Sequence, residues 1–164
     1  MEQKRIKVAI THGDTNGVGY EVILKAFDDP QMLELCTPII YGSPKVAAYH
    51  RKVLNLQTNF TIIEKAEEAK EGKLNLLTTF DDEVKIELGT PAKEAGEAAL
   101  AALDRAMTDY RSGLYDVIVT APINKKTIQS NLFHFCGHTE YIESCVGDGN
   151  KALMILMNDV LKVA

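Results

Sequence analysis

The chain has 164 residues, of which 46% are hydrophobic and 25% are charged, and its formal net charge is −5. This length and composition suit one folded unit with a single core and exclude disorder of the whole chain. The negative charge, with no basic stripe, excludes a nucleic-acid partner, and no apolar stretch has the length of a membrane span. The start of the chain does not resemble a secretion signal and the three cysteines form no CxxC pair. We therefore predict a cytoplasmic protein with no membrane partner.

Short apolar segments alternate with amphipathic ones along the chain. The apolar segments predict strands at 6–11, 37–41, 60–63, 74–77, 84–88, 116–120 and 152–157, of which 74–77 and 84–88 are expected in a more exposed region. The amphipathic segments predict helices that start near Gly19, Ser43-Pro44 and Asn124, and helices over 93–111 and 139–146. A charged run at 64–72 is interpreted as a solvated connection. Strands alternating with helices indicate a layered α/β fold with a mostly parallel sheet, in which the apolar 116–120 is covered on both faces.

The last five residues, 160–164, have the pattern of another strand. A natural domain rarely stops inside a core strand, because the unpaired edge would be exposed. We therefore expect the sequence to be a piece of a longer protein.

The first motif, THGDTNGVGYE at 11–21, lies between a predicted strand and a predicted helix. Its glycines are spaced GxxxGxG, which matches neither the dinucleotide fingerprint nor a P-loop. Such a loop can bind an anion at the start of a helix, or it can simply make the tight turn from strand to helix, and the pattern alone favours the turn. His12 and Asp14 could be catalytic, but hydrogen bonding within the loop is the favoured interpretation.

The second motif, VTAPINKK at 119–126, follows the strand predicted at 116–120. It places Thr120, Asn124 and Lys125 at the carboxyl edge of the sheet, where ligands of such folds bind. Lys125 can pair with a phosphate or carboxylate, or it can be a solvated lysine in the first turn of a helix. A cation at that end opposes the helix dipole, which favours the functional interpretation.

The third motif, GHTE at 137–140, opens a predicted helix. Thr139 suits the N-cap position, whereas His138 could hydrogen-bond an anionic or hydroxylated ligand held at the helix start. His50 is interpreted as a surface residue of an amphipathic helix. The four histidines form no ligand pair, so the sequence predicts no metal site in this chain.

In this order, the motifs resemble the 4-hydroxythreonine-4-phosphate dehydrogenase family of vitamin B6 biosynthesis. The resemblance is carried by ITHGDTNGVGYE, TAPINK, GHTEYIE and the apolar run ALMILM. The family pattern at the first motif is similar to GDPxGIGPE, so Thr15 and Tyr20 stand where prolines are usual.

The resemblance implies an isocitrate/isopropylmalate dehydrogenase-like α/β fold, with residues 1–164 as the amino-terminal portion of a two-domain homodimer and the second domain absent. It implies oxidation of 4-hydroxythreonine 4-phosphate with NAD or NADP and a divalent metal, followed by decarboxylation to 3-amino-2-oxopropyl phosphate in pyridoxal phosphate biosynthesis.

The resemblance also implies roles for three residues. His138 and Thr139 match the pair that contacts the substrate, and Lys125 matches a lysine near the site. The family's metal ligands lie beyond residue 164, so we expect the chain alone to be inactive. Two alternatives remain open: a dehydrogenase for another four-carbon acid sugar phosphate, such as a phosphorylated tetronate, and a non-catalytic phosphate-binding or assembly module.

Overall fold

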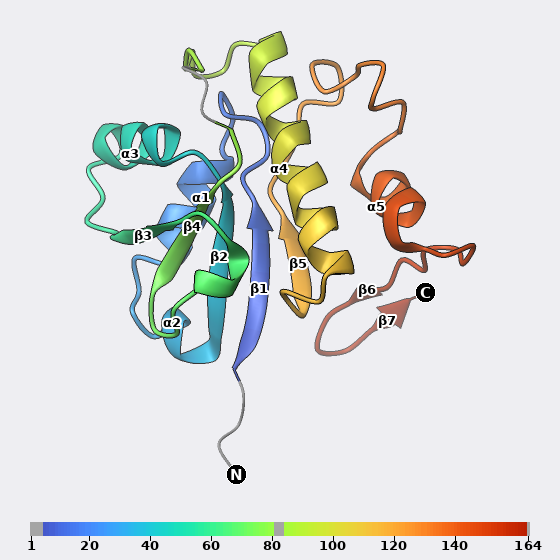
Figure 1. Ribbon diagram of the computed structural model, residues 1–164, viewed down its shortest axis with the longest axis horizontal. Coiled ribbons are helices and arrows are strands. Elements are labelled where there is room, and N and C mark those ends of the chain that lie inside the picture. The colour runs from blue at the N-terminus through green and yellow to red at the C-terminus, as the bar shows by residue number, and fades with distance from the viewer. Residues whose placement is uncertain (1–4, 81–83, 164) are drawn as a thin grey trace.

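A parallel sheet with helices on both faces forms the body of the protein (Figure 1). The computed structural model describes residues 5–80 and 84–163. Its five-stranded sheet has the order β3-β4-β2-β1-β5, with strands β1 Ile6–Thr11, β2 Cys36–Gly42, β3 Phe60–Ile63, β4 Leu74–Thr78 and β5 Val117–Thr120. The helices are α1 Gly19–Ala26, α2 Met32–Leu35, α3 Pro44–Val53, α4 Lys93–Arg111 and α5 His138–Val146, with a 3₁₀ turn η1 at Ala66–Glu68. A separate antiparallel pair is formed by β6 Leu156–Met157 and β7 Lys162–Val163.

Each face of the sheet buries its own apolar cluster. On one face, α4 packs against alternate strand residues such as Ala9 and Ile39. On the other face, α1 and α3 pack against Ile10 and Ile40. Since successive strand residues point to opposite faces, this division follows from the two-residue period of β1 and β2.

The long helix α4 has the bounds expected from its periodicity. Its buried side is mostly alanine, which lets the helix approach the sheet closely; the buried residues include Ala95, Ala98, Ala99, Ala102 and Ala106. Near its end, the buried Asp109 accepts a hydrogen bond of 2.9 Å from the Tyr41 hydroxyl and pairs with Arg105 at 3.0 Å. The sheet and α4 are thereby joined by polar contacts as well as by apolar packing.

Two expectations for the region between β3 and α4 are wrong. Residues 74–77 lie in the buried β4, between β2 and β3, rather than in an exposed region. Residues 84–88 form no strand, because this extended segment is bound by one asparagine instead of a neighbouring strand. The Asn16 side chain accepts from the Glu87 amide at 2.9 Å and donates to the Thr90 carbonyl at 2.8 Å.

The expected strand at 152–157 is also largely absent. Only Leu156 and Met157 are in a strand, and they pair with β7 outside the main sheet. The side chains of residues 153–157 are 55–71% exposed. Residues 160–163 belong to the same hairpin, and Ala164 lies outside the described residues.

The strand β5 confirms the expected segment, but not its burial. It pairs with β1 on one side and forms an edge of the sheet. Ile118 packs under α4, whereas Val117 and Val119 on the opposite face are 46% and 52% exposed. Within the described part of the chain, no helix is both long and apolar enough to cross a membrane.

Candidate functional site

The first and second motifs meet at the carboxyl edge of the sheet. Thr11 and Thr120 are partners at the ends of β1 and β5. Just beyond them, the Ala121 amide donates to the Thr11 carbonyl at 3.0 Å, and the Asp14 amide donates to the Pro122 carbonyl at 2.9 Å. Parallel strands end at the same edge, so segments far apart in the sequence become neighbours here.

The glycine-rich loop is packed against this junction and bonded to itself. Gly13 has a positive φ of 74°, and a methyl group there would lie 2.3 Å from the Pro122 carbonyl oxygen. The Asp14 carboxylate accepts from the Asn16 amide at 2.9 Å, and the Asp14 carbonyl accepts from the Gly17 amide at 3.0 Å. These amides are therefore occupied, which supports the tight-turn interpretation over an anion site. Asp14 bonds within the loop, as the pattern favoured.

Three aromatic rings fix the loop to α3. Tyr20 stacks between His12 and His50, with ring centroids 5.1 Å and 5.2 Å away. The Tyr20 hydroxyl accepts from the Ser43 amide at 2.9 Å, and His50 Nε2 lies 2.9 Å from the Thr15 carbonyl. Burial lowers the pKa of His12 to about 4, so its imidazole is neutral at pH 7. Both ring nitrogens of His12 are buried without a hydrogen-bond partner among the described residues, so His12 is held by this stacking and not by the hydrogen bonding within the loop that the sequence favoured.

The expectation that His50 is a surface residue is wrong, because only 3% of it is exposed. It lies on the same helix face as the buried Val46 and Ala47. That shared face was the signal in the sequence that could have identified its burial.

The segment after β5 makes a single turn and not the expected helix. The Ile128 amide donates to the Asn124 carbonyl at 3.1 Å, and the Asn124 side chain accepts from the amides of Lys126 and Thr127. Since this turn has no helix dipole to oppose, that argument for Lys125 does not hold. The functional interpretation of Lys125 is supported instead by its position near His138.

Lys125 lies beside the start of α5. Gly137 is the N-cap of this helix, and a methyl group on it would lie 3.9 Å from Lys125 Nζ. His138 is the first helical residue, and its Nε2 is buried without a hydrogen-bond partner in the described structure. Burial, and then the positive charge of Lys125, lowers the pKa of His138. Thr139 is exposed in the first turn and is not the N-cap, which corrects the sequence-based expectation.

This arrangement suits an anionic, hydroxylated ligand. A neutral imidazole can exchange a hydrogen bond with a hydroxyl group, and an ammonium group beside it can pair with a phosphate or carboxylate. The first amide groups of an α-helix have no acceptor within the helix, and they lie at the positive end of its dipole, so those of α5 also favour an anion. We call Lys125, His138 and Thr139 the candidate site.

The residues present do not fit a metal centre. Among residues 5–80 and 84–163, no three His, Cys, Asp or Glu side chains come together as a possible metal site. No catalytic step can therefore be assigned to a metal through the side chains of this part of the chain.

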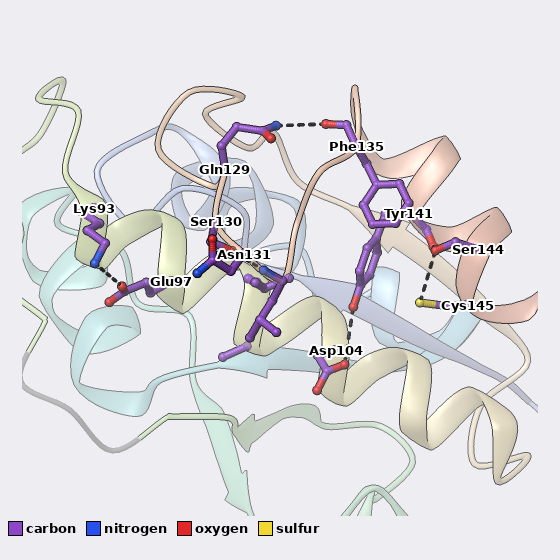
Figure 2. Close-up of a pocket in the computed structure, with 13 residues that line it drawn as sticks. Lys93, Glu97, Asp104, Gln129, Ser130, Asn131, Phe135, Tyr141, Ser144 and Cys145 are labelled. Carbon is purple, nitrogen blue, oxygen red and sulfur yellow. Dashed lines mark hydrogen bonds and ion pairs between the residues drawn. The ribbon is translucent and has the colours of Figure 1, made fainter.

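A separate cavity of about 1080 Å³ lies between α4 and α5 and includes neither Lys125 nor His138 (Figure 2). The Tyr141 hydroxyl points from α5 to the Asp104 carboxylate on α4, 3.5 Å away. The Gln129 side chain donates to the Phe135 carbonyl at 2.9 Å. Most of the polar groups that line the cavity thus bond to one another. No local pattern predicts this cavity, because two segments distant in the sequence form it.

The sequence profile of the family described as "Pyridoxal phosphate biosynthetic protein PdxA" matches residues 34–164. A 4-hydroxythreonine-4-phosphate dehydrogenase of Bacteroides thetaiotaomicron is 64% identical over the whole chain, which covers 45% of that relative. A "Putative D-threonate 4-phosphate dehydrogenase" of Clostridium botulinum is 34% identical, with 82% of this chain and 41% of that relative covered.

Solved structures show the same likeness. The crystal structure of a 4-hydroxythreonine-4-phosphate dehydrogenase from Burkholderia phymatum superposes with a TM-score of 0.83 at 27% identity, covering 98% of this chain and 49% of that one. The fold is therefore that of these dehydrogenases, which is isocitrate/isopropylmalate dehydrogenase-like. The chain spans about half the length of the relatives it matches.

Proposed function

Because this chain belongs to the PdxA family of pyridoxal phosphate biosynthetic proteins, we propose that it serves in the oxidation of 4-hydroxythreonine 4-phosphate with NAD or NADP. The secondary alcohol of this substrate loses a hydride to the nicotinamide and a proton, which gives a β-keto acid. Loss of carbon dioxide from that acid yields 3-amino-2-oxopropyl phosphate.

One observation carries this proposal from the family to particular residues: Lys125 and His138 adjoin at the start of α5. In the proposed complex, the ammonium group of Lys125 pairs with the phosphate or carboxylate of the substrate. His138 and Thr139 hydrogen-bond its polar oxygens and hold the molecule against the helix start. All three are binding residues in this proposal.

We assign no cofactor-binding residue in this chain. The loop GxxxGxG lacks the dinucleotide fingerprint, and amides of that loop are bonded internally. The divalent metal of the family would need ligands from outside the described residues. We propose that the protein acts in the cytoplasm as a homodimer, and that residues 1–164 alone do not turn over the substrate.

D-threonate 4-phosphate is a second candidate substrate, and one specific observation supports it. The 34% identical relative from Clostridium botulinum is named for D-threonate 4-phosphate, which is also a four-carbon hydroxy acid with a terminal phosphate. The candidate site offers groups for the features that both substrates share, so the two remain competing substrates.

The test uses a chimera, which we call the extended chain. In it, this chain is continued by the part of the Bacteroides thetaiotaomicron relative that follows the matched region. Nicotinamide reduction is measured with each substrate, with NAD and with NADP, in the presence of divalent metal. We expect turnover by the extended chain and higher kcat/KM for 4-hydroxythreonine 4-phosphate. Preference for D-threonate 4-phosphate supports the second candidate, and phosphate binding without turnover supports a non-catalytic module.

A further inference from the structure

The strand β5 leaves an apolar surface uncovered on the side of the sheet that carries α1 and α3. Val117 and Val119 pair in register with Val8 and Ile10, so they share the face that α1 packs against. Val117 and Val119 are 46% and 52% exposed, and Ile6 at the start of β1 is 53% exposed. Ile6, Val117 and Val119 therefore form an exposed apolar strip on this face of the sheet.

The helix α1 extends this strip. A methyl group on Gly19 would lie 3.1 Å from the Ala121 side chain, so the first turn of α1 lies against the end of β5. Val22 is on the same side of the helix as Gly19, and Val18 is one turn before Val22. Val18 and Val22 are 54% and 57% exposed, at positions where a surface helix ordinarily carries charged or polar residues. We call Ile6, Val117, Val119, Val18 and Val22 the β5 surface.

The widths of sheet and helices explain why this surface is open. Neighbouring strands are about 4.8 Å apart and packed helices about 8–10 Å apart, so one helix covers roughly two strands. On this face, α1 and α3 bury the middle strands β1, β2 and β4. Space for a third helix remains over β5, and no described element of the chain buries it. A parallel strand in an α/β protein is normally covered on both faces.

We infer that the β5 surface is the docking site for an amphipathic helix from the sequence that follows the matched region in the relatives. The chain matches the amino-terminal 45% of its Bacteroides relative, so that relative carries more than enough further sequence to supply one. The β5 surface also has a polar border, which suits an amphipathic helix. This border is the ion pair of Glu21 and Lys25, which lies beside Val22 on α1. This inference depends on the length of the relatives and not on the substrate.

The first test is residue-level carbene footprinting of the 164-residue chain and of the extended chain. We expect labelling at Val22 and Val119 to fall at least fivefold in the extended chain. Ile62 is the matched control, because it is 54% exposed on the same face at the opposite edge strand, β3, and should be labelled equally in both. Equal labelling of Val22 and Val119 in the two proteins would overturn the inference.

The second test separates the helix from a second copy of the chain. Val119→Asp should lower the melting temperature of the extended chain and leave that of the 164-residue chain unchanged, whereas Ile62→Asp should shift both alike. In the alternative outcome, sedimentation shows that the 164-residue chain dimerises, and the labelling of Val22 and Val119 in that chain falls as its concentration rises. The occupant is then a second copy and our assignment is wrong. An equal shift by Val119→Asp in both proteins would also contradict it.

Discussion

The Lys125 ammonium group lies beside His138 at the start of α5, where the burial of the ring, and then the charge of Lys125, lower the pKa of the imidazole. The two residues belong to different motifs, one on the turn after β5 and the other on the first turn of a helix. Their proximity places a cation next to a neutral ring whose Nε2 is buried without a described partner.

Replacing Lys125 should raise the pKa of His138. In Lys125→Gln the like charge is gone, so the imidazolium form becomes less unfavourable, but burial is the larger cause and keeps the pKa below its ordinary value. NMR titration of the His138 ring measures this directly. The neighbouring Lys126→Gln serves as control and should leave the titration unchanged. A His138 titration that is the same in Lys125→Gln and the parent would show that the two side chains are not coupled.

Acid should destabilise the fold through His12. Its folded pKa is about 4, below the ordinary 6.5, so the unfolded chain binds the extra proton between these values and stability falls as pH falls through that window. Between pH 7.5 and pH 5 this one group should cost about 2 kcal/mol of unfolding free energy. Urea titrations at both pH values should show that His12→Phe loses about 2 kcal/mol less than the parent. An equal loss in both proteins would refute the assignment to His12.

The Tyr20 hydroxyl should contribute to stability through the Ser43 amide. In Tyr20→Phe the stacked ring remains, but this buried amide loses its acceptor, and we expect a cost of about 1–3 kcal/mol in urea unfolding. Tyr49→Phe is the control, since Tyr49 is 40% exposed and its ring contact with His50 does not need the hydroxyl. Similar effects of the two substitutions would mean that the hydroxyl bond is not what holds the loop to α3.

Gly96 in α4 should not tolerate alanine. Glycine to alanine inside a helix ordinarily stabilises by about 1 kcal/mol. Here the methyl group would lie 2.1 Å from the Thr127 carbonyl oxygen, so α4 would have to move away from the turn that carries Lys125. We expect a loss of about 3 kcal/mol in chemical denaturation. Thr108→Ala on the exposed side of α4 should change stability by less than about 0.5 kcal/mol. A gain in stability for Gly96→Ala would disprove the close approach.

The elements that the sequence predicted well are those whose periodicity is local. The apolar run of β1 and the alanine spacing in α4 depend only on neighbouring residues, and the predicted strand and helix formed there. The segments at 84–88 and 152–157 were misassigned because their structure depends on distant partners. Asn16 binds the first in an extended form, and the second has no neighbour in the main sheet and pairs only with β7.

The candidate site was predictable in its composition but not in its geometry. Motif spacing singled out Lys125 and His138, and the rule that parallel strands end at one edge explains why the first two motifs meet. Neither the motif spacing nor this rule could predict that Asn124 forms a turn, that Gly137 caps α5, or that Thr139 is exposed. Those outcomes depend on how the segment 121–137 packs against α4, which no local pattern encodes.

The binding role of residues 138 and 139 is tested most directly in the extended chain. The double variant His138→Ala with Thr139→Ala removes two hydrogen-bonding groups at the start of α5, each worth about 1–3 kcal/mol when lost from a desolvated contact. Steady-state kinetics with 4-hydroxythreonine 4-phosphate should then show kcat/KM reduced by about 100-fold or more, with circular dichroism and melting temperature close to those of the parent. If the double variant keeps the parent kcat/KM, the substrate binds elsewhere and the proposed site is wrong.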